Sequence, residues 1–359
     1  MKIAFITRST LFKVPGGDTV QVMQLARQMR QSGIAADIVL TNQAINYSGY
    51  DLFHFSNITR PADILFHIPR LKKPFIVSPI LIEYGEYDRY YRGGISGLIL
   101  KKFKQHTNEY IKTLSRWIKG SDILRSKKYL WKGQQKSIRE IIRKAAMLMP
   151  GTEAEYRRIK ELFGLEKEYV VVPNGIDSSV FHADSIAEKD NQLVLCAARI
   201  EGIKNQLNLV KALNNTRYTL LLIGSPAPNQ KEYYEECKRI AAGNVHFYNH
   251  VPQEILTGYY RAAKVHVLPS WFETCGLSSL EAAAMGCNIA ITDKGYTREY
   301  FGNDAFYCDP GNPKSIFEAV DKAARSEPSK RLQEKVINNY TWQKAASITL
   351  ETCKNIIYG

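Results

Sequence analysis

The residues with the clearest chemical potential lie in the stretch PSWFETCGLSSLEAAAMGC, residues 269–287. An apolar segment before it predicts a strand and its Ala-rich half predicts a helix, so the loop leads into a helix N-terminus. Unpaired N–H groups at such a terminus bind anions, and Gly276 lets the backbone approach a ligand closely. Glu273 and Glu281, with seven residues between them, suit the hydroxyls of a ligand that also carries phosphate. A surface loop followed by an acidic residue near a helix start is the simpler alternative.

This spacing resembles the E-x(7)-E motif of retaining glycosyltransferase family 4. The resemblance implies an α/β protein with the GT-B architecture, in which two Rossmann-like domains face across a cleft. It also implies that Glu273 contacts the transferred sugar and that Glu281 accepts hydrogen bonds from ribose hydroxyls. The N–H groups around Gly276 and Leu277 would then meet sugar or phosphate. The resemblance is strongest over residues 190–312.

Arg199 and Lys204 follow an expected strand and open an expected helix. Two cations placed on a departing diphosphate would stabilise the charge that grows as a sugar–phosphate bond breaks. Cations at a helix N-terminus oppose the helix dipole, which favours a functional reason for them. The pair matches the family's Arg and Lys after the first strand of the second domain. No Asp-x-Asp element ends a strand, so we expect no metal and no other cofactor.

The first half of the chain offers weaker candidates. Gly16 and Gly17 lie between the first strand and the first helix, where the family's loop touches the diphosphate of the donor. His54 is expected to end a buried strand that faces the cleft, and a hydrogen-bonded core histidine fits as well. Three acids beyond the next strand could bind acceptor hydroxyls or belong to a solvated loop: Glu83, Glu86 and Asp88.

A chain of 359 residues suggests two domains. Short apolar strands that alternate with helices predict two parallel sheets covered by helices. In the first half we expect strands at 2–7, 37–40, 52–55, 75–78, 145–149 and 169–172. The predicted acceptor-side domain comprises 1–173 and, as the resemblance implies, a returning C-terminal helix at 342–359. Residues 174–341 would bind the nucleotide sugar.

The net charge of +14 is concentrated in one segment. Between Arg92 and Lys144, 15 Lys or Arg residues stand against three acids, and about 84–144 reads as an insertion in the first domain. The segment also carries Trp117, Trp131 and an apolar stripe of Ile111, Leu114 and Ile118. An amphipathic segment on anionic membrane and an insertion packed on its own domain fit equally well. No nucleic-acid motif accompanies the charge, so we expect no nucleic-acid partner.

The six cysteines show no paired spacing, which is typical of a reducing compartment. The first residues predict a strand and not a signal peptide, and no apolar run reaches spanning length. We therefore expect a cytoplasmic protein, with a peripheral position on the inner face of the cytoplasmic membrane as an option.

The sequence thus predicts a retaining, metal-independent hexosyltransferase. It would move a sugar from a nucleotide-diphosphate sugar to a glycan or lipid-linked acceptor, in cell-envelope polysaccharide or lipopolysaccharide assembly. Retention would follow a same-face route in which the leaving phosphate helps to deprotonate the acceptor, with Glu273 as a covalent nucleophile the less favoured route. Two alternatives stay open: a catalytically silent GT-B membrane or scaffold protein, and a phosphorylase-like or sucrose-synthase-like enzyme.

Overall fold

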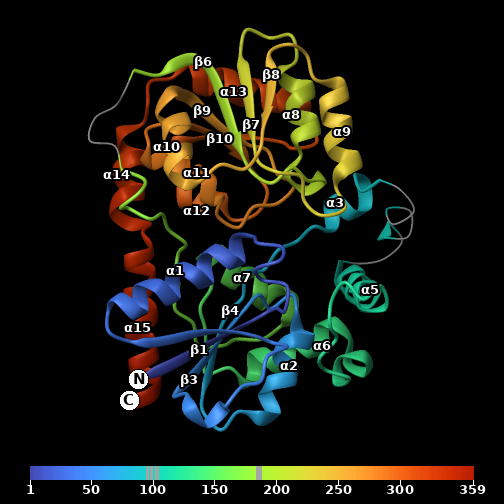
Figure 1. The fold of residues 1–359 in the computed structure, drawn as a ribbon, viewed down its shortest axis with the longest axis vertical. Helices are drawn as coiled ribbons and strands as arrows, with labels where there is room; N and C mark the ends of the chain where they lie inside the picture. Colours follow the sequence, from blue (N-terminus) through green and yellow to red (C-terminus); the bar gives the residue numbers. More distant parts are fainter. Residues whose placement is uncertain (94–96, 98–99, 102–104, 183–187) are drawn as a thin grey trace. The chain divides into compact units, whose positions relative to one another are not determined.

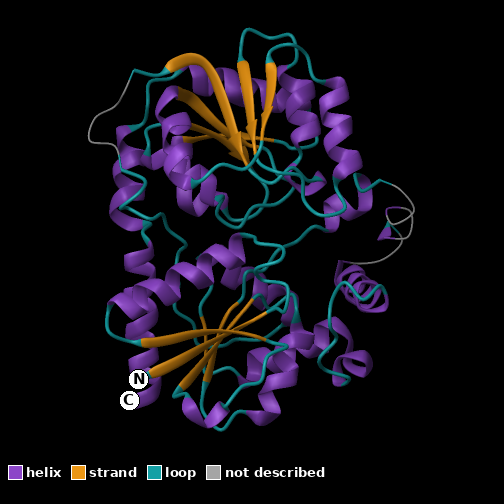
Figure 2. Cartoon of the chain, viewed as in Figure 1, coloured by secondary structure: helices purple, strands orange, loops and turns teal. Residues whose placement is uncertain are grey.

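The computed structural model describes the whole chain except residues 94–96, 98–99, 102–104 and 183–187. Part of the predicted basic insertion therefore lies outside the described residues. The chain divides into a first unit, Met1–Asn174 with Trp342–Gly359, and a second unit, Gly175–Thr341. Figure 2 shows that helices flank the strands of a sheet in each unit.

The first unit is built on a five-stranded parallel sheet in the order β2-β1-β3-β4-β5. Its strands are β1 (Lys2–Thr7), β2 (Ala35–Leu40), β3 (Leu52–Ser56), β4 (Phe75–Ser78) and β5 (Met147–Leu148). Its α-helices are α1 (Gly17–Gln31), α2 (Pro61–His67), α3 (Gly85–Tyr90), α5 (Gln105–Ile118), α6 (Lys128–Lys144), α7 (Glu153–Phe163) and α15 (Trp342–Tyr358). The last helix, α15, packs on α1 (Figure 1). Asn174 is the last residue of the first unit before the chain enters the second. The Gln21 amide donates to its Oδ1 at 2.8 Å and anchors it to α1.

Two predicted strands of the first unit are shorter than expected. The segment 145–149 pairs only over β5, and the predicted strand at 169–172 is reduced to a parallel bridge between Leu148 and Tyr169. Pro150 explains the early end, since it has no N–H with which to continue the ladder. Its carbonyl still accepts from the Val172 N–H at 2.8 Å.

The second unit holds a six-stranded parallel sheet in the order β11-β10-β9-β6-β7-β8. Its strands are β6 (Asp190–Ala197), β7 (Thr219–Ile223), β8 (Val245–Tyr248), β9 (Ala263–Leu268), β10 (Asn288–Thr292) and β11 (Ala305–Cys308). Its α-helices are α8 (Gln206–Leu213), α9 (Lys231–Ile240), α10 (Gln253–Ala262), α11 (Leu277–Ala284), α12 (Thr297–Phe301), α13 (Pro313–Arg325) and α14 (Lys330–Asn339). Both faces of this sheet are buried in apolar clusters. The two central strands, β9 and β6, are therefore packed on both faces, which fixes the positions of the loops that follow them.

The fold is of the α/β class, as predicted, with two parallel sheets of Rossmann type. Within each unit, loops that follow strands gather at the carboxyl edge of the sheet. In open α/β sheets this edge is where ligands bind.

Candidate active site

The motif loop connects the carboxyl end of β9 to the start of α11. Gly276 precedes the helix with φ +71°, a left-handed conformation that side chains resist, and its carbonyl accepts from the N–H groups of Ser279 and Leu280. A Cβ at Gly276 would also lie 3.0 Å from Ile291 Cδ1. Glycine is therefore required for the chain to turn here, and Leu277 becomes the first residue of α11 at the carboxyl edge of the sheet.

Glu273 is a buried carboxylate whose position is fixed from several sides. Its Oε1 accepts from Lys204 Nζ at 2.5 Å and from the buried Ser270 hydroxyl at 2.6 Å. Its own N–H donates to the Lys294 carbonyl, and a Cβ at Gly295 would lie only 2.0 Å from its carbonyl oxygen. The loop after β10 thus clamps the backbone of Glu273, and Ser270 and Lys204 hold the side chain.

The two predicted cations lie in the loop that follows β6. Arg199 Nη2 lies 2.8 Å from Glu201 Oε1, and Lys204 is paired with Glu273. Burial works to lower the pKa of the Lys204 ammonium, but the charge of Glu273, its hydrogen bond and the charge of Glu201 together outweigh burial, and the pKa is raised. Lys204 therefore stays charged through the neutral range.

The sequence predicted that Lys204 opens a helix. Lys204 instead ends a 3₁₀ turn over Gly202–Lys204, and α8 begins after it. Asn205 separates the turn from the helix because it adopts φ +63°, and its side-chain amide donates to the carbonyls of Pro269 and Pro310. The bond to Pro269, together with the hydrogen bond from the Trp271 N–H to the Ile203 carbonyl at 3.0 Å, ties the cation loop to the motif loop. These two bonds account for the short distance from Lys204 to Glu273, which the sequence did not reveal.

Glu281 lies on α11, and two neighbours from α10 hold it. Tyr260 donates its hydroxyl to Oε2 at 3.2 Å, and the Gln253 amide donates to Oε1 at 3.3 Å. Burial raises the pKa of this carboxyl to about 7, although both hydrogen bonds act to lower it. Tyr260 and Gln253 were missed because nothing in their local sequence marks them.

Residues 177–341 match the family model described as glycosyl transferases group 1. The D-inositol 3-phosphate glycosyltransferase of Paenarthrobacter aurescens is 25% identical over 396 residues, which cover 96% of this chain and 94% of that protein. The protein of the same name from an Arthrobacter species is also 25% identical, over 94% of this chain and 89% of its own length. Over residues 177–341 the chain is therefore similar to the group 1 glycosyl transferases.

Solved structures confirm the predicted GT-B fold. Sucrose-phosphate synthase from Thermosynechococcus elongatus superposes with a TM-score of 0.78 at 15% identity, over 99% of both chains. The Anabaena protein HepE in complex with UDP-glucose superposes with a TM-score of 0.62 at 14% identity, over 99% of this chain and 98% of that one.

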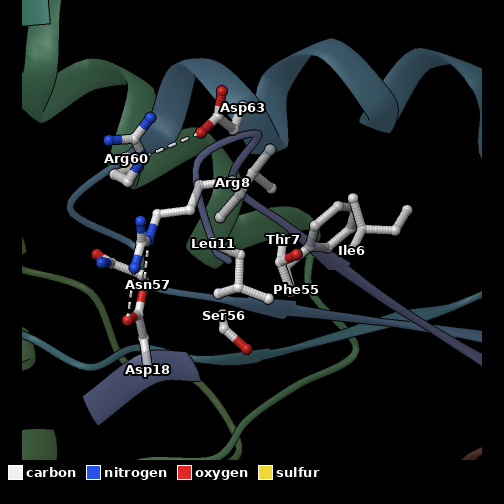
Figure 3. Close-up of a pocket in the computed structure, with 11 residues that line it drawn as sticks. Ile6, Thr7, Arg8, Leu11, Asp18, Phe55, Ser56, Asn57, Arg60 and Asp63 are labelled. Carbon is white, nitrogen blue, oxygen red and sulfur yellow. Dashed lines mark hydrogen bonds and ion pairs between the residues drawn. The ribbon is translucent and has the colours of Figure 1, made fainter. Parts of the chain in front are cut away.

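In the first unit, the loop from β1 to α1 is held by an ion pair. Arg8 donates to both carboxylate oxygens of Asp18, at 2.7 and 3.0 Å (Figure 3). It also donates to the Val14 carbonyl at 2.8 Å. Gly16 caps α1, its N–H donates to Thr19 Oγ1 at 3.0 Å, and Gly17 is the first helical residue. The contact of these glycines with a diphosphate stays a prediction.

The pair between Arg8 and Asp18 borders a pocket at the carboxyl ends of β1 and β3. Figure 3 shows Thr7, Ser56 and Asn57 on its wall, with Arg60 and Asp63 from the start of α2 beside them. Arg60 binds Asp63 at 3.1 Å and also contacts Asp122. Sequence reasoning missed this pocket because its lining comes from three separate segments.

The expectation for His54 was wrong in its geometry. The strand continues to Ser56, so His54 lies within β3, where it is buried and its ring centroid lies 4.8 Å from that of Phe5. A hydrogen bond of 2.8 Å joins its Nε2 to Ser78 Oγ, and burial lowers its pKa to about 3. A neutral histidine locked in the core is not placed to exchange protons with a substrate near neutral pH.

The acceptor candidates Glu83 and Asp88 are engaged in ion pairs. Arg158 donates to both oxygens of Glu83, at 2.7 and 2.8 Å. Asp88 is fully buried and binds Arg92 at 2.7 Å and Lys112. Burial removes Asp88 from contact with an acceptor, whereas Glu86 is exposed on α3.

Within the described residues, no group of three or more His, Cys, Asp or Glu side chains is placed to hold a metal ion, and no helix is long and apolar enough to cross a bilayer.

Proposed function

We propose that the protein is a glycosyltransferase that binds a nucleotide-diphosphate sugar at the carboxyl edge of the second unit's sheet and transfers the sugar with retention and without a metal ion. The observation that carries the proposal is the cluster of Lys204, Glu273 and Ser270 beside Arg199. It combines two cations for phosphate with a fixed carboxylate for hydroxyls, within one loop pair at a helix N-terminus.

Lys204 can serve the carboxylate and the phosphate together. An ammonium group has three N–H donors, and Glu273 accepts one of them. The others can reach a diphosphate oxygen, and Arg199 can add a guanidinium fork. As the bond from sugar to phosphate breaks, the charge that grows on the diphosphate meets cations that are already in place.

Glu273 is suited to binding hydroxyls and poorly suited to nucleophilic attack. Its Oε1 is neutralised by Lys204 and accepts a hydrogen bond from Ser270, and both contacts lower the reactivity of the carboxylate. This supports the same-face route, in which the leaving phosphate takes the proton of the acceptor, over a covalent glycosyl intermediate on Glu273. Glu281, held by Tyr260 and Gln253, would accept from the ribose hydroxyls.

We propose a glycan or lipid-linked acceptor of the cell envelope. A phosphorylated polyol is the second candidate, because the relatives that span most of the chain are named D-inositol 3-phosphate glycosyltransferases. The cytoplasm is the proposed location, which fits six free, buried cysteines.

A panel of nucleotide sugars tests which donor binds. It begins with UDP-glucose because the similar structure of HepE was solved in complex with UDP-glucose. We expect one nucleotide sugar to raise the melting temperature, followed by slow hydrolysis of that donor and by transfer when D-inositol 3-phosphate or a lipid-linked glycan is added. Binding without hydrolysis or transfer would favour the silent scaffold. Release of a sugar phosphate on addition of inorganic phosphate would favour a phosphorylase.

A further inference from the structure

Four exposed apolar side chains gather in a short stretch of the first unit. Trp117 and Ile118 end α5, Ile123 lies in the following loop, and Trp131 lies in the first turn of α6. Trp131 is 91% exposed and Ile118 is 78% exposed. Scattered single residues of this kind are normal on a protein surface, but two tryptophans and two isoleucines within 15 residues are a concentration that needs a reason.

The fold holds these side chains outward. On α6, Tyr129 is fully buried and Trp131, two residues later, lies on the opposite side of the helix. Asp122 is anchored by Arg60 and accepts from Ser9 at 3.3 Å, which fixes the loop next to Ile123. Trp117 and Ile123 line one shallow depression. The apolar stripe predicted on α5 is therefore divided: Ile111 and Leu114 are half-buried, whereas Ile118 faces solvent.

The segment around these residues carries a net positive charge, because its basic residues outnumber its acidic residues. Residues 105–144 hold eleven Lys or Arg and three acids. Each acid is already paired: Glu109 with Lys112, Asp122 with Arg60, and Glu140 with Lys128 and Lys132 at 2.8 and 2.6 Å. The basic residues left exposed include Lys119, Lys127, Lys136, Arg139 and Arg143.

We propose that this surface, formed by Trp117, Ile118, Ile123 and Trp131 with the basic residues of 119–144, docks the first unit on an anionic lipid bilayer. Tryptophan is favoured at the level of the lipid headgroups, isoleucine gains from entering the acyl boundary, and lysine and arginine are attracted by anionic headgroups. The surface is separate from the proposed donor site, which lies in the second unit, so it stands or falls independently of the proposed chemistry.

The aliphatic members distinguish a bilayer from a nucleic acid. Single-stranded nucleic acids are held by basic residues and by aromatic rings on which bases stack. Ile118 and Ile123 have no ring for stacking, and hydrocarbon is the environment that rewards their burial. The combination of aliphatic, indole and cationic groups therefore favours lipid.

Intrinsic fluorescence gives a direct readout of docking. The chain has four tryptophans, and Trp271 and Trp342 are buried in the fold. A blue shift on addition of vesicles therefore reports on Trp117 and Trp131. We expect the shift, together with co-sedimentation, for vesicles of equimolar phosphatidylcholine and phosphatidylglycerol at low salt, and its loss at high salt.

Matched variants separate the surface from general stickiness. Trp131→Ala and Ile118→Ala should each weaken binding to the mixed vesicles about tenfold, whereas Ile255→Ala, at an exposed apolar position of the second unit, should leave it unchanged. Lys127→Glu should weaken binding by about 25-fold, since each basic residue near an anionic surface contributes about fivefold and the reversal of one charge counts twice. Lys211→Glu, on α8, is the charge control.

Several outcomes would overturn the proposal. These are no binding to the mixed vesicles at low salt, equal binding to pure phosphatidylcholine, wild-type binding by the Trp131 and Ile118 variants, or tighter binding of a single-stranded oligonucleotide than of the vesicles at the same salt. The melting temperature of each variant shows whether it is folded, so a loss of binding can be assigned to the surface.

Discussion

Each unit places an arginine or lysine paired with a carboxylate at the carboxyl edge of its parallel sheet, but the two sets differ in access. In the second unit the Lys204 and Arg199 side chains are 22% and 37% exposed. In the first unit Arg8 is 12% exposed and binds both oxygens of Asp18 as well as a backbone carbonyl. A cation near a sheet edge can therefore bind a ligand or stabilise a loop. A side chain whose donors are used within the protein, as in Arg8, stabilises the loop, whereas a more exposed one can bind a ligand.

The largest effect should come from removing the accessible cation of the second unit. Lys204→Ala should lower turnover with a confirmed donor by about 10²–10³, the loss typical of one transition-state charge stabiliser. Steady-state rates, with circular dichroism to verify folding, measure it. Because the variant also leaves buried Glu273 unpaired, Lys204→Gln is the companion that keeps a donor at this position. Turnover near wild type in both would remove Lys204 from the chemistry.

The same change in the first unit should act on stability instead. Arg8→Ala leaves Asp18 shielded and without its partner, so the free energy of unfolding should fall by about 3 kcal/mol. Urea unfolding measures this, with Arg298→Ala as the control, because its pair with Asp293 is exposed and should contribute less than about 1 kcal/mol. Equal losses in the two variants would show that the Arg8 pair does not brace the loop.

Burial raises the pKa of Asp18, but its bonds and charge interaction with Arg8 outweigh this and lower the pKa below its ordinary value. Asp18 therefore contributes stability that is present above its unfolded pKa and is lost as the pH falls through its folded pKa. The deficit of Arg8→Ala should accordingly shrink in acid.

Glu281 should make donor binding depend on pH near neutrality. Its pKa is raised to about 7, so the carboxylate that would accept the ribose hydroxyls is lost as the pH falls from 8 to 6, and donor affinity should fall by up to about tenfold. Glu281→Gln should bind more weakly at pH 8 and show no such dependence. A pH-independent affinity in the wild type would argue against a ribose contact.

Ionisation of Glu281 should affect protein stability in the opposite sense to donor affinity: its contribution to stability should grow as the pH falls. A carboxyl with a raised folded pKa contributes stability below its unfolded pKa that is lost as the pH rises through its folded pKa. Glu281 should therefore stabilise the fold as the pH is lowered from about 7 toward 4.5, the range between its two pKa values. Thermal unfolding of wild type and Glu281→Gln over this range separates the contribution of Glu281 to stability from the contributions of other titrating groups.

The smallest effect should come from chelation. If the two cations of the second unit alone neutralise the departing diphosphate, EDTA should leave turnover unchanged. Activity that is abolished by EDTA and restored by Mg²⁺ or Mn²⁺ would mean that a metal shares this task.

The parts that the sequence predicted well are those set by local pattern. The strands β1 and β4 follow from apolar periodicity, and the GT-B fold follows from the resemblance carried by one contiguous motif. The contact of Glu273 with Lys204, 69 residues away, depends on Asn205 tying two loops together, and no local pattern encodes that.

Side-chain environment was harder still to predict. His54 looked like a site residue by its place in a strand, but the Ser78 hydroxyl, 24 residues away, makes it a core residue. Asp88 looked like a loop acid, and its partner Lys112 lies on a different helix. Burial and pairing of charge depend on tertiary contacts, which the sequence pattern does not show.

The central claim is that the accessible cations of the second unit hold a diphosphate. Calorimetric titration with UDP and UMP, or with the di- and monophosphate of whichever nucleoside the donor screen selects, tests it most directly. Wild type should prefer the diphosphate by at least about tenfold, and the double variant Arg199→Ala with Lys204→Ala should lose that preference while retaining the monophosphate affinity. Equal affinity of the wild type for the two nucleotides, or a preference that survives in the double variant, would contradict the account.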